Sequence, residues 1–125
     1  TVNAKREPGD QRVIETKIPI VTLNTFIRQN NIGKIDLMKI DVETHEPEVL
    51  EGFSDFFFKF RPTVLIEILT PEVGARINDI MKGSGYLYFY LDEQGGARLV
   101  NEITISEYYN YLLCPPEAAK KIGLL

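Results

Sequence analysis

The most constraining feature of the chain is an apolar run that ends in acids and passes at once into a helix-like pattern. The run covers residues 35–42, with Asp41, Glu43 and Glu46 at or just after its end, beside His45, the only histidine. Nearly continuous apolar sequence is typical of a strand buried in a parallel sheet. In an open α/β sheet, ligands bind where the carboxyl end of a strand turns into a helix. The sequence therefore predicts an α/β fold with a candidate site at this turn.

Composition narrows the class of protein and of partner. The net charge is −4 and the pI about 5.0, so neither a nucleic-acid backbone nor an anionic membrane is an expected partner. The sequence holds no apolar run of the ~20 residues that span a bilayer, and no signal peptide is visible. The single cysteine, Cys114, cannot form an internal disulfide, which fits a reducing, cytoplasmic setting. We expect one domain over residues 1–125, with a flexible leader at residues 1–11.

Hydrophobic periodicity predicts strands alternating with helices through the middle of the chain, followed by strands alone. Thr22 is an expected N-cap, and Pro47 fits the first turn of a helix, where its missing N–H has no partner to lose. This order predicts a mostly parallel sheet with an antiparallel strand at its edge. The expected strands cover residues 12–21, 35–42, 63–69, 86–91, 97–100 and 108–114, and the expected helices cover residues 23–30, 46–58, 71–82 and 117–122.

Four segments of the chain match one family pattern in order and in spacing. They are residues 22–27, 35–46 (IDLMKIDVETHE), 49–52 and 62–67. They resemble the FkbM-type methyltransferases, which are class I enzymes that use S-adenosylmethionine. The resemblance implies a Rossmann-like methyltransferase sheet and S-adenosylmethionine as cofactor.

Two departures from the family pattern bear on structure. Thr44 stands where the family usually has glycine, so a turn that favours positive φ carries a β-branched residue. Asn24 replaces the usual aspartate.

The resemblance covers the later part of the family's domain. Family members hold the cofactor largely through a glycine-rich loop after the first strand and an acid after the second, both upstream of the matching segments. Gly83, Gly85 and the Gly95-Gly96 pair come too late and lack the strand–loop–helix setting. The resemblance therefore implies that the chain supplies the C-terminal half of the sheet, from the fourth strand onward.

Asp41 is expected to act in catalysis and to contact the cofactor, because the resemblance places it near the transferred methyl group. The alternative is that it caps the next helix. Glu43 and His45 are the other expected catalytic residues. An imidazole with a pKa of ~6.5 suits a general base, and the alternative for His45 is a solvated histidine without a catalytic role. Glu46 and Glu67 are expected to bind substrate, and Glu67 lies near the end of the next strand.

The acids and His45 also offer oxygen and nitrogen ligands close in sequence, as a hard cation or zinc requires. A helix N-terminus is equally enriched in acids that complement its dipole, and we assign no metal ligand. The expected function is S-adenosylmethionine-dependent methyl transfer to a hydroxyl oxygen of a small molecule or sugar. The alternative is a non-catalytic methyltransferase-like module that forms a homodimer through an exposed sheet edge.

Overall fold

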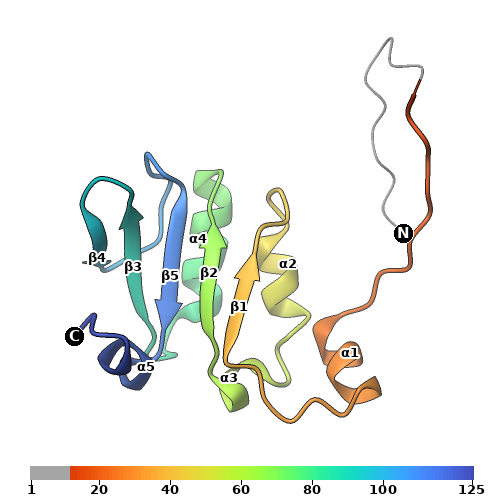
Figure 1. The fold of residues 1–125 in the computed structure, drawn as a ribbon, viewed down its shortest axis with the longest axis horizontal. Helices are drawn as coiled ribbons and strands as arrows, with labels where there is room; N and C mark the ends of the chain where they lie inside the picture. The colour runs from red at the N-terminus through yellow and green to blue at the C-terminus, as the bar shows by residue number, and fades with distance from the viewer. Residues whose placement is uncertain (1–11) are drawn as a thin grey trace.

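A computed structural model describes residues 12–125, so the leader expected at residues 1–11 lies outside the described residues. Within these residues, five strands form one sheet with helices packed against it (Figure 1). The strands are β1 (Leu37–Ile40), β2 (Thr63–Glu67), β3 (Leu87–Asp92), β4 (Gly96–Val100) and β5 (Asn110–Cys114). The helices are α1 (Leu23–Gln29), α2 (Glu46–Glu51), α3 (Phe57–Phe60), α4 (Pro71–Met81) and α5 (Pro116–Lys121).

The sheet is mixed and mostly antiparallel, so the expectation of a mostly parallel sheet was wrong. Its strand order is β1-β2-β5-β3-β4, and among the described strands only β1 and β2 pair in parallel. The last strand, β5, is inserted between β2 and β3 and runs antiparallel to both. β1, β2 and β3 therefore still point the same way. β5 separates β3 from β2, although these two strands run in the same direction. The strand at this edge of the sheet is β4, which is antiparallel to β3.

Residues 12–21 form no strand, although a β-rich run predicted one. Pro19 lacks the N–H that a ladder needs. Ile14, Ile18 and Ile20 are 85%, 52% and 58% exposed, so no packed face holds the segment against the sheet.

The strand predicted at residues 35–42 is present but shorter, and only one of its faces is buried. β1 lies at the edge of the sheet, with Ile40 at 2% exposure and Leu37 at 68%. The expected burial on both faces was therefore wrong. The other expected helices and strands are present with small shifts at their ends, except for the helix expected at residues 46–58.

The helix expected over residues 46–58 is interrupted because Gly52 ends α2 and the chain bends before α3. A contact from far away in the sequence fixes this bend: the Asn24 N–H donates to the Gly52 carbonyl oxygen at 2.8 Å. A Cβ on residue 52 would lie 3.3 Å from the Thr22 Cβ. Glycine therefore lets the start of α1 approach the end of α2 closely.

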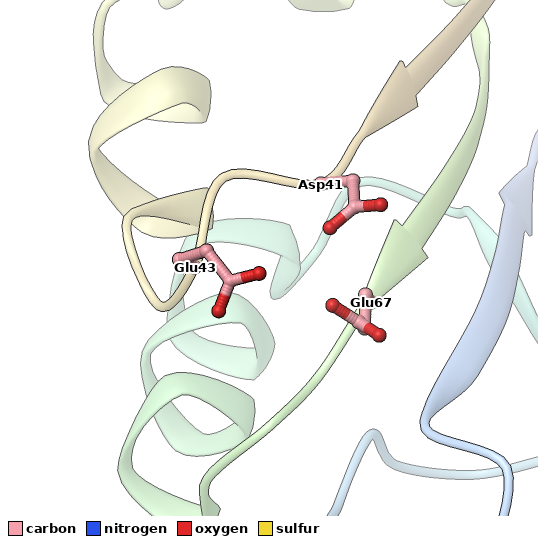
Figure 2. A group of neighbouring side chains, drawn as sticks. All are labelled: Asp41, Glu43 and Glu67. Carbon is pink, nitrogen blue, oxygen red and sulfur yellow. The ribbon is translucent and has the colours of Figure 1, made fainter. Parts of the chain in front are cut away.

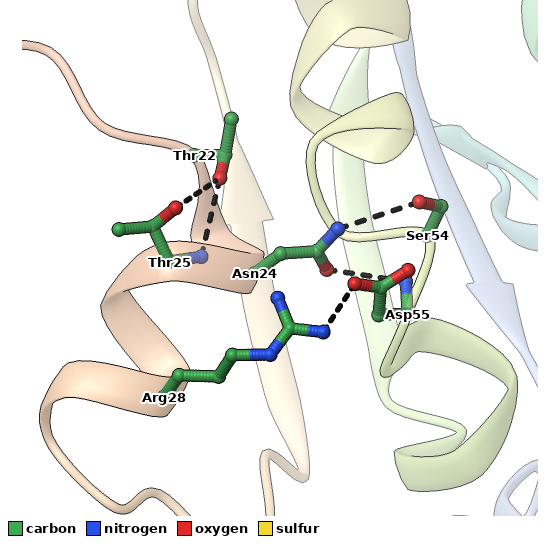
Figure 3. Close-up of polar contacts among 6 residues, drawn as sticks. All are labelled: Thr22, Asn24, Thr25, Arg28, Ser54 and Asp55. Carbon is green, nitrogen blue, oxygen red and sulfur yellow. Dashed lines mark hydrogen bonds and ion pairs between the residues drawn. The ribbon is translucent and has the colours of Figure 1, made fainter.

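Side-chain contacts hold the same junction together (Figure 3). The Asn24 side chain accepts the Asp55 N–H at 3.1 Å and donates to the Ser54 hydroxyl at 3.4 Å. An asparagine offers both a donor and an acceptor, whereas the aspartate usual in the family offers acceptors alone. Thr22 caps α1 as expected, since its hydroxyl accepts the Thr25 N–H at 3.1 Å. The family departure at residue 24 is therefore accommodated by local hydrogen bonding.

The main core lies between the sheet and the helices α2 and α4. Side chains alternate along β2, so Val64 and Ile66 are fully buried and share one cluster with Phe53, which is also 0% exposed. On the opposite face α5 covers β3 and β5 through Ala119, which packs with Phe89 (Figure 1). The two faces of the sheet are therefore covered unequally.

We expect Phe53→Ala to destabilise the fold by about 3–5 kcal/mol, because it empties a fully buried site that two other phenylalanine rings contact. Phe58→Ala is the matched control: Phe58 is 48% exposed, and we expect a loss below about 1 kcal/mol. Urea unfolding followed by circular dichroism measures both values. Equal losses in the two variants would contradict this account of the core.

Candidate functional site

Three carboxylates gather at the carboxyl edge of the parallel strand pair (Figure 2). Asp41 directly follows β1, Glu67 ends β2, and Glu43 lies in the loop between β1 and α2. One ligand oxygen from each of the three lies within 4.8 Å of the others. We call these three residues the acid cluster.

The strand register explains how Asp41 meets Glu67. Ile40 pairs with Ile66 in the parallel ladder, and both side chains are buried against the helices. The next residue on each strand, Asp41 and Glu67, therefore points to the opposite face. The helix α5 covers this face at β3 and β5 but not at β1, where Leu37 is 68% exposed. The two acids are thus placed side by side on an accessible part of the sheet.

Glu43 reaches the cluster because the loop after β1 turns sharply. Glu43 and Thr44 have φ of 52° and 78°, in the left-handed region. The positive φ expected at the position where the family usually has glycine is therefore confirmed. For residues with a Cβ this conformation costs about 1–2 kcal/mol, so the loop is held in a strained shape.

Burial and repulsion within the cluster change the acidity of Glu67. The pKa of the Glu67 carboxyl is raised above its usual value, first by burial and then by the charge of Asp41. A hydrogen bond to Asp41, which only a protonated Glu67 can donate, adds to the rise, as do the charges of Glu43 and Glu46. Lys39 offsets part of this repulsion, since its Nζ lies 3.6 Å from Asp41 Oδ2. The cluster therefore favours holding a proton or a cation.

His45 and Glu46, the other expected site residues, lie outside the cluster. His45 sits at the start of α2 with its side chain 74% exposed, and its Nδ1 lies 3.8 Å from Glu48 Oε2. Glu46 is fully buried, and its Oε1 accepts the Val42 N–H at 3.1 Å. Its Oε2 has no hydrogen-bond partner. Glu46 therefore shapes the loop that presents Asp41 and Glu43.

Arg76 contacts the helix that follows the acid cluster, and sequence reasoning missed it. From α4 it donates to Glu48 at 2.6 Å and to Glu51 at 3.0 Å, so it ties α4 to α2. Its hydrogen bond is the main reason why the pKa of Glu48 is lowered. The signal in the sequence that could have indicated this contact is the spacing of Glu48 and Glu51, which places both acids on one face of a helix.

The acid cluster offers carboxylate oxygens alone, which suits a hard divalent cation or an organic cation. Because His45 lies apart, a zinc or iron site of the carboxylate–histidine kind is not assembled. Exposed acids also gather without any ion, so this geometry assigns no metal. A surface hollow of about 270 Å³ lies elsewhere, beside the end of α4, and none of its walls comes from the cluster.

Comparison with known protein families shows which family the chain belongs to. The methyltransferase FkbM domain matches residues 2–88, which is most of the chain. The chain belongs to the FkbM methyltransferase family. The FkbM match includes α1, the acid cluster and α4, and it ends inside β3. No curated protein and no solved structure matches the chain.

The described residues of this FkbM domain hold no helix that is both long and apolar enough to cross a membrane.

We expect Thr44→Gly to stabilise the protein by about 1 kcal/mol, because glycine adopts a φ of 78° without the clash that a Cβ causes. Thr25→Gly is the control, since Thr25 lies inside α1 and is not among the residues with positive φ. There the same substitution should destabilise by about 1 kcal/mol. Thermal unfolding of the two variants gives the comparison, and a loss of stability in Thr44→Gly would refute the strain.

We expect Glu67→Gln to raise the melting temperature at pH 7 by a few degrees, because it removes one of three clustered negative charges. The raised pKa means that the folded state binds more protons than the unfolded chain. Stability therefore falls as pH rises from the ordinary pKa of 4.5 through the folded value, and Glu67→Gln abolishes that fall.

The control for this prediction is Glu93→Gln, which removes an exposed acid from the β3–β4 turn. Melting temperatures of both variants and the parent, measured from pH 4 to pH 8, test the assignment. A profile for Glu67→Gln that runs parallel to the parent's would contradict the link between Glu67 and the cluster.

Proposed function

We propose that this FkbM domain binds S-adenosylmethionine at the acid cluster and takes part in methyl transfer to a hydroxyl oxygen. Family membership carries the general chemistry, which is methyl transfer. The observation that supports the cofactor is the convergence of Asp41, Glu43 and Glu67 at the carboxyl edge of the parallel strands. Ligands of open α/β sheets bind at this edge.

The chemistry of the cluster fits the proposed cofactor. The sulfonium, amino group and ribose hydroxyls of S-adenosylmethionine interact favourably with carboxylates, and its own carboxylate would have to point away from the acid cluster. The Asp41 side chain is 44% exposed, so it can accept hydrogen bonds from a bound molecule. When bound, the cofactor supplies an electrophilic methyl group. After burial, the charges of the neighbouring acids raise the pKa of Glu67, and a cation placed here relieves that repulsion.

The residues of the chain would position the acceptor and take its proton. Burial and the nearby charge of Asp41 raise the pKa of Glu67, which makes it a stronger base than an ordinary glutamate. We propose that a Glu67 oxygen accepts the hydroxyl proton while Asp41 orients the acceptor. His45, the other proposed base, lies with its side chain directed to Glu48 and would need a change of rotamer to take this role.

The charge of the site restricts the proposed acceptor. Three carboxylates repel an acceptor that carries a phosphate or carboxylate near its reacting oxygen. They accept hydrogen bonds from neighbouring hydroxyl groups instead. We therefore propose a neutral small molecule or a saccharide with several hydroxyls as the acceptor class.

A second candidate function is a non-catalytic interaction module. The observation in its favour is the edge position of β1, which leaves one side of that strand without a partner among the described strands. An exposed edge can pair with another chain. Binding of S-adenosylmethionine distinguishes the two candidates, because an interaction module has no need of it.

The first test is a calorimetric titration of S-adenosylmethionine into the purified chain. We expect saturable binding, weakened about tenfold or more by Asp41→Asn, which keeps the shape and removes the charge. Asp36→Asn is the matched control, because Asp36 precedes the other end of β1 and pairs with Lys34 at 3.0 Å. No binding by a chain shown to be folded, or equal weakening in both variants, would refute the proposed cofactor site.

A further inference from the structure

A hollow of about 270 Å³ lies at the C-terminal end of α4, apart from the acid cluster. Helix α4 starts shortly after Glu67 and runs back along the sheet toward the start of β3 (Figure 1). Its 11 residues extend roughly 16 Å, which separates the hollow from the edge of the sheet that carries the cluster. We call it the α4 hollow. Its walls come from the end of α4, from β3 and from the segment after β4, and they are Asn78, Asp79, Lys82, Tyr88, Asn101 and Glu102.

Two walls of the α4 hollow are fixed to each other. The Asn78 side chain donates to the Ile103 carbonyl oxygen at 2.8 Å and accepts the Ile103 N–H at 2.9 Å. The Ile103 side chain is buried, and a Cβ on Gly74 would lie 3.0 Å from the same carbonyl oxygen. The segment that carries Asn101 and Glu102 is therefore packed directly on α4. A site that is formed before its ligand arrives loses less free energy on binding.

The charged side chains of the α4 hollow are available to a ligand. Asp79, Lys82 and Glu102 are all exposed. Within the part of the chain that the structure describes, none of the three takes part in an ion pair. A bound molecule therefore does not have to break an existing ion pair to reach them.

These side chains offer both donors and acceptors of hydrogen bonds. The carboxylates of Asp79 and Glu102 only accept, the ammonium of Lys82 only donates, and the amide of Asn101 does both. A hydroxyl group donates one hydrogen bond and accepts others, so neighbouring hydroxyls on a ring can use a carboxylate and an ammonium together. Tyr88 adds an aromatic ring, against which the C–H face of a sugar ring can pack.

Charge and size restrict the ligand further. Asp79 and Glu102 carry two negative charges and Lys82 carries one positive charge, so the α4 hollow opposes an anionic ligand. Its volume of about 270 Å³ is below the range of about 300–1,000 Å³ that is typical for drug-sized ligands. A neutral ligand of about one ring with several hydroxyls fits both limits.

We propose that the α4 hollow binds one residue of a neutral saccharide, at a site separate from methyl transfer. Asp79 and Glu102 accept hydrogen bonds from the hydroxyls of the sugar, and Lys82 donates to them. No wall of the α4 hollow comes from the acid cluster, so this binding is independent of the proposed cofactor site.

A titration followed by two-dimensional amide NMR spectra tests the site. The probes are glucose, galactose and mannose, each added to the parent chain up to about 100 mM, because we expect a Kd of about 1–10 mM for a single sugar ring. At least one of the three should shift the amide signals of residues 78–82 and 101–103 in a saturable way. The 6-phosphate of the same sugar should bind roughly tenfold more weakly, because its charge is repelled.

Two variants connect this binding to the walls of the α4 hollow. Asp79→Ala and Glu102→Ala should each weaken it about tenfold, because each removes a charged acceptor. Glu72→Ala is the matched control, since Glu72 is an exposed acid in the first turn of α4 and is not part of the hollow. It should leave the Kd unchanged. The same spectra show whether each variant keeps the fold of the parent.

Three outcomes would overturn the saccharide site. The first is the absence of a saturable shift with all three sugars. The second is a set of shifts confined to residues 41–43 and 67, which would place the sugar at the acid cluster as an acceptor. The third is equal weakening by Glu72→Ala and Asp79→Ala. A 6-phosphate that binds as tightly as its parent sugar would overturn the assignment of a neutral ligand.

Discussion

The parallel pairing of β1 with β2 is the contact on which both the core and the candidate site depend. Its register places Ile40 beside Ile66 on the buried face and, one residue later, Asp41 beside Glu67 on the other. A slip by one residue would bury the acids and expose the isoleucines. Burial of apolar side chains therefore fixes the geometry of a cluster whose own charges repel. This is why repulsion can persist at the site without pulling the strands apart.

The loop after β1 concentrates unfavourable features that the rest of the domain must offset. Glu43 and Thr44 adopt positive φ, Glu67 has a raised pKa, and the buried Glu46 leaves one oxygen without a hydrogen bond. Each costs stability on its own. In folded proteins strain of this kind persists where the surroundings over-determine it, and such places are often functional. The physical cost of this loop therefore makes its residues candidates for function within the FkbM domain.

Local signals in the sequence located most of the helices and strands but not their arrangement. Periodicity located β2 and α4 closely, and the comparison at Thr44 anticipated its positive φ. The break at Gly52 could not be predicted, because it depends on contacts with Thr22 and Asn24 that lie far away in the sequence. The insertion of β5 beside β2 is a long-range choice as well. For the site, the position of Glu67 near the end of the next strand indicated its nearness to Asp41, which the parallel pairing produces. Nearness in sequence did not indicate that the His45 side chain would lie apart from Asp41, beside Glu48.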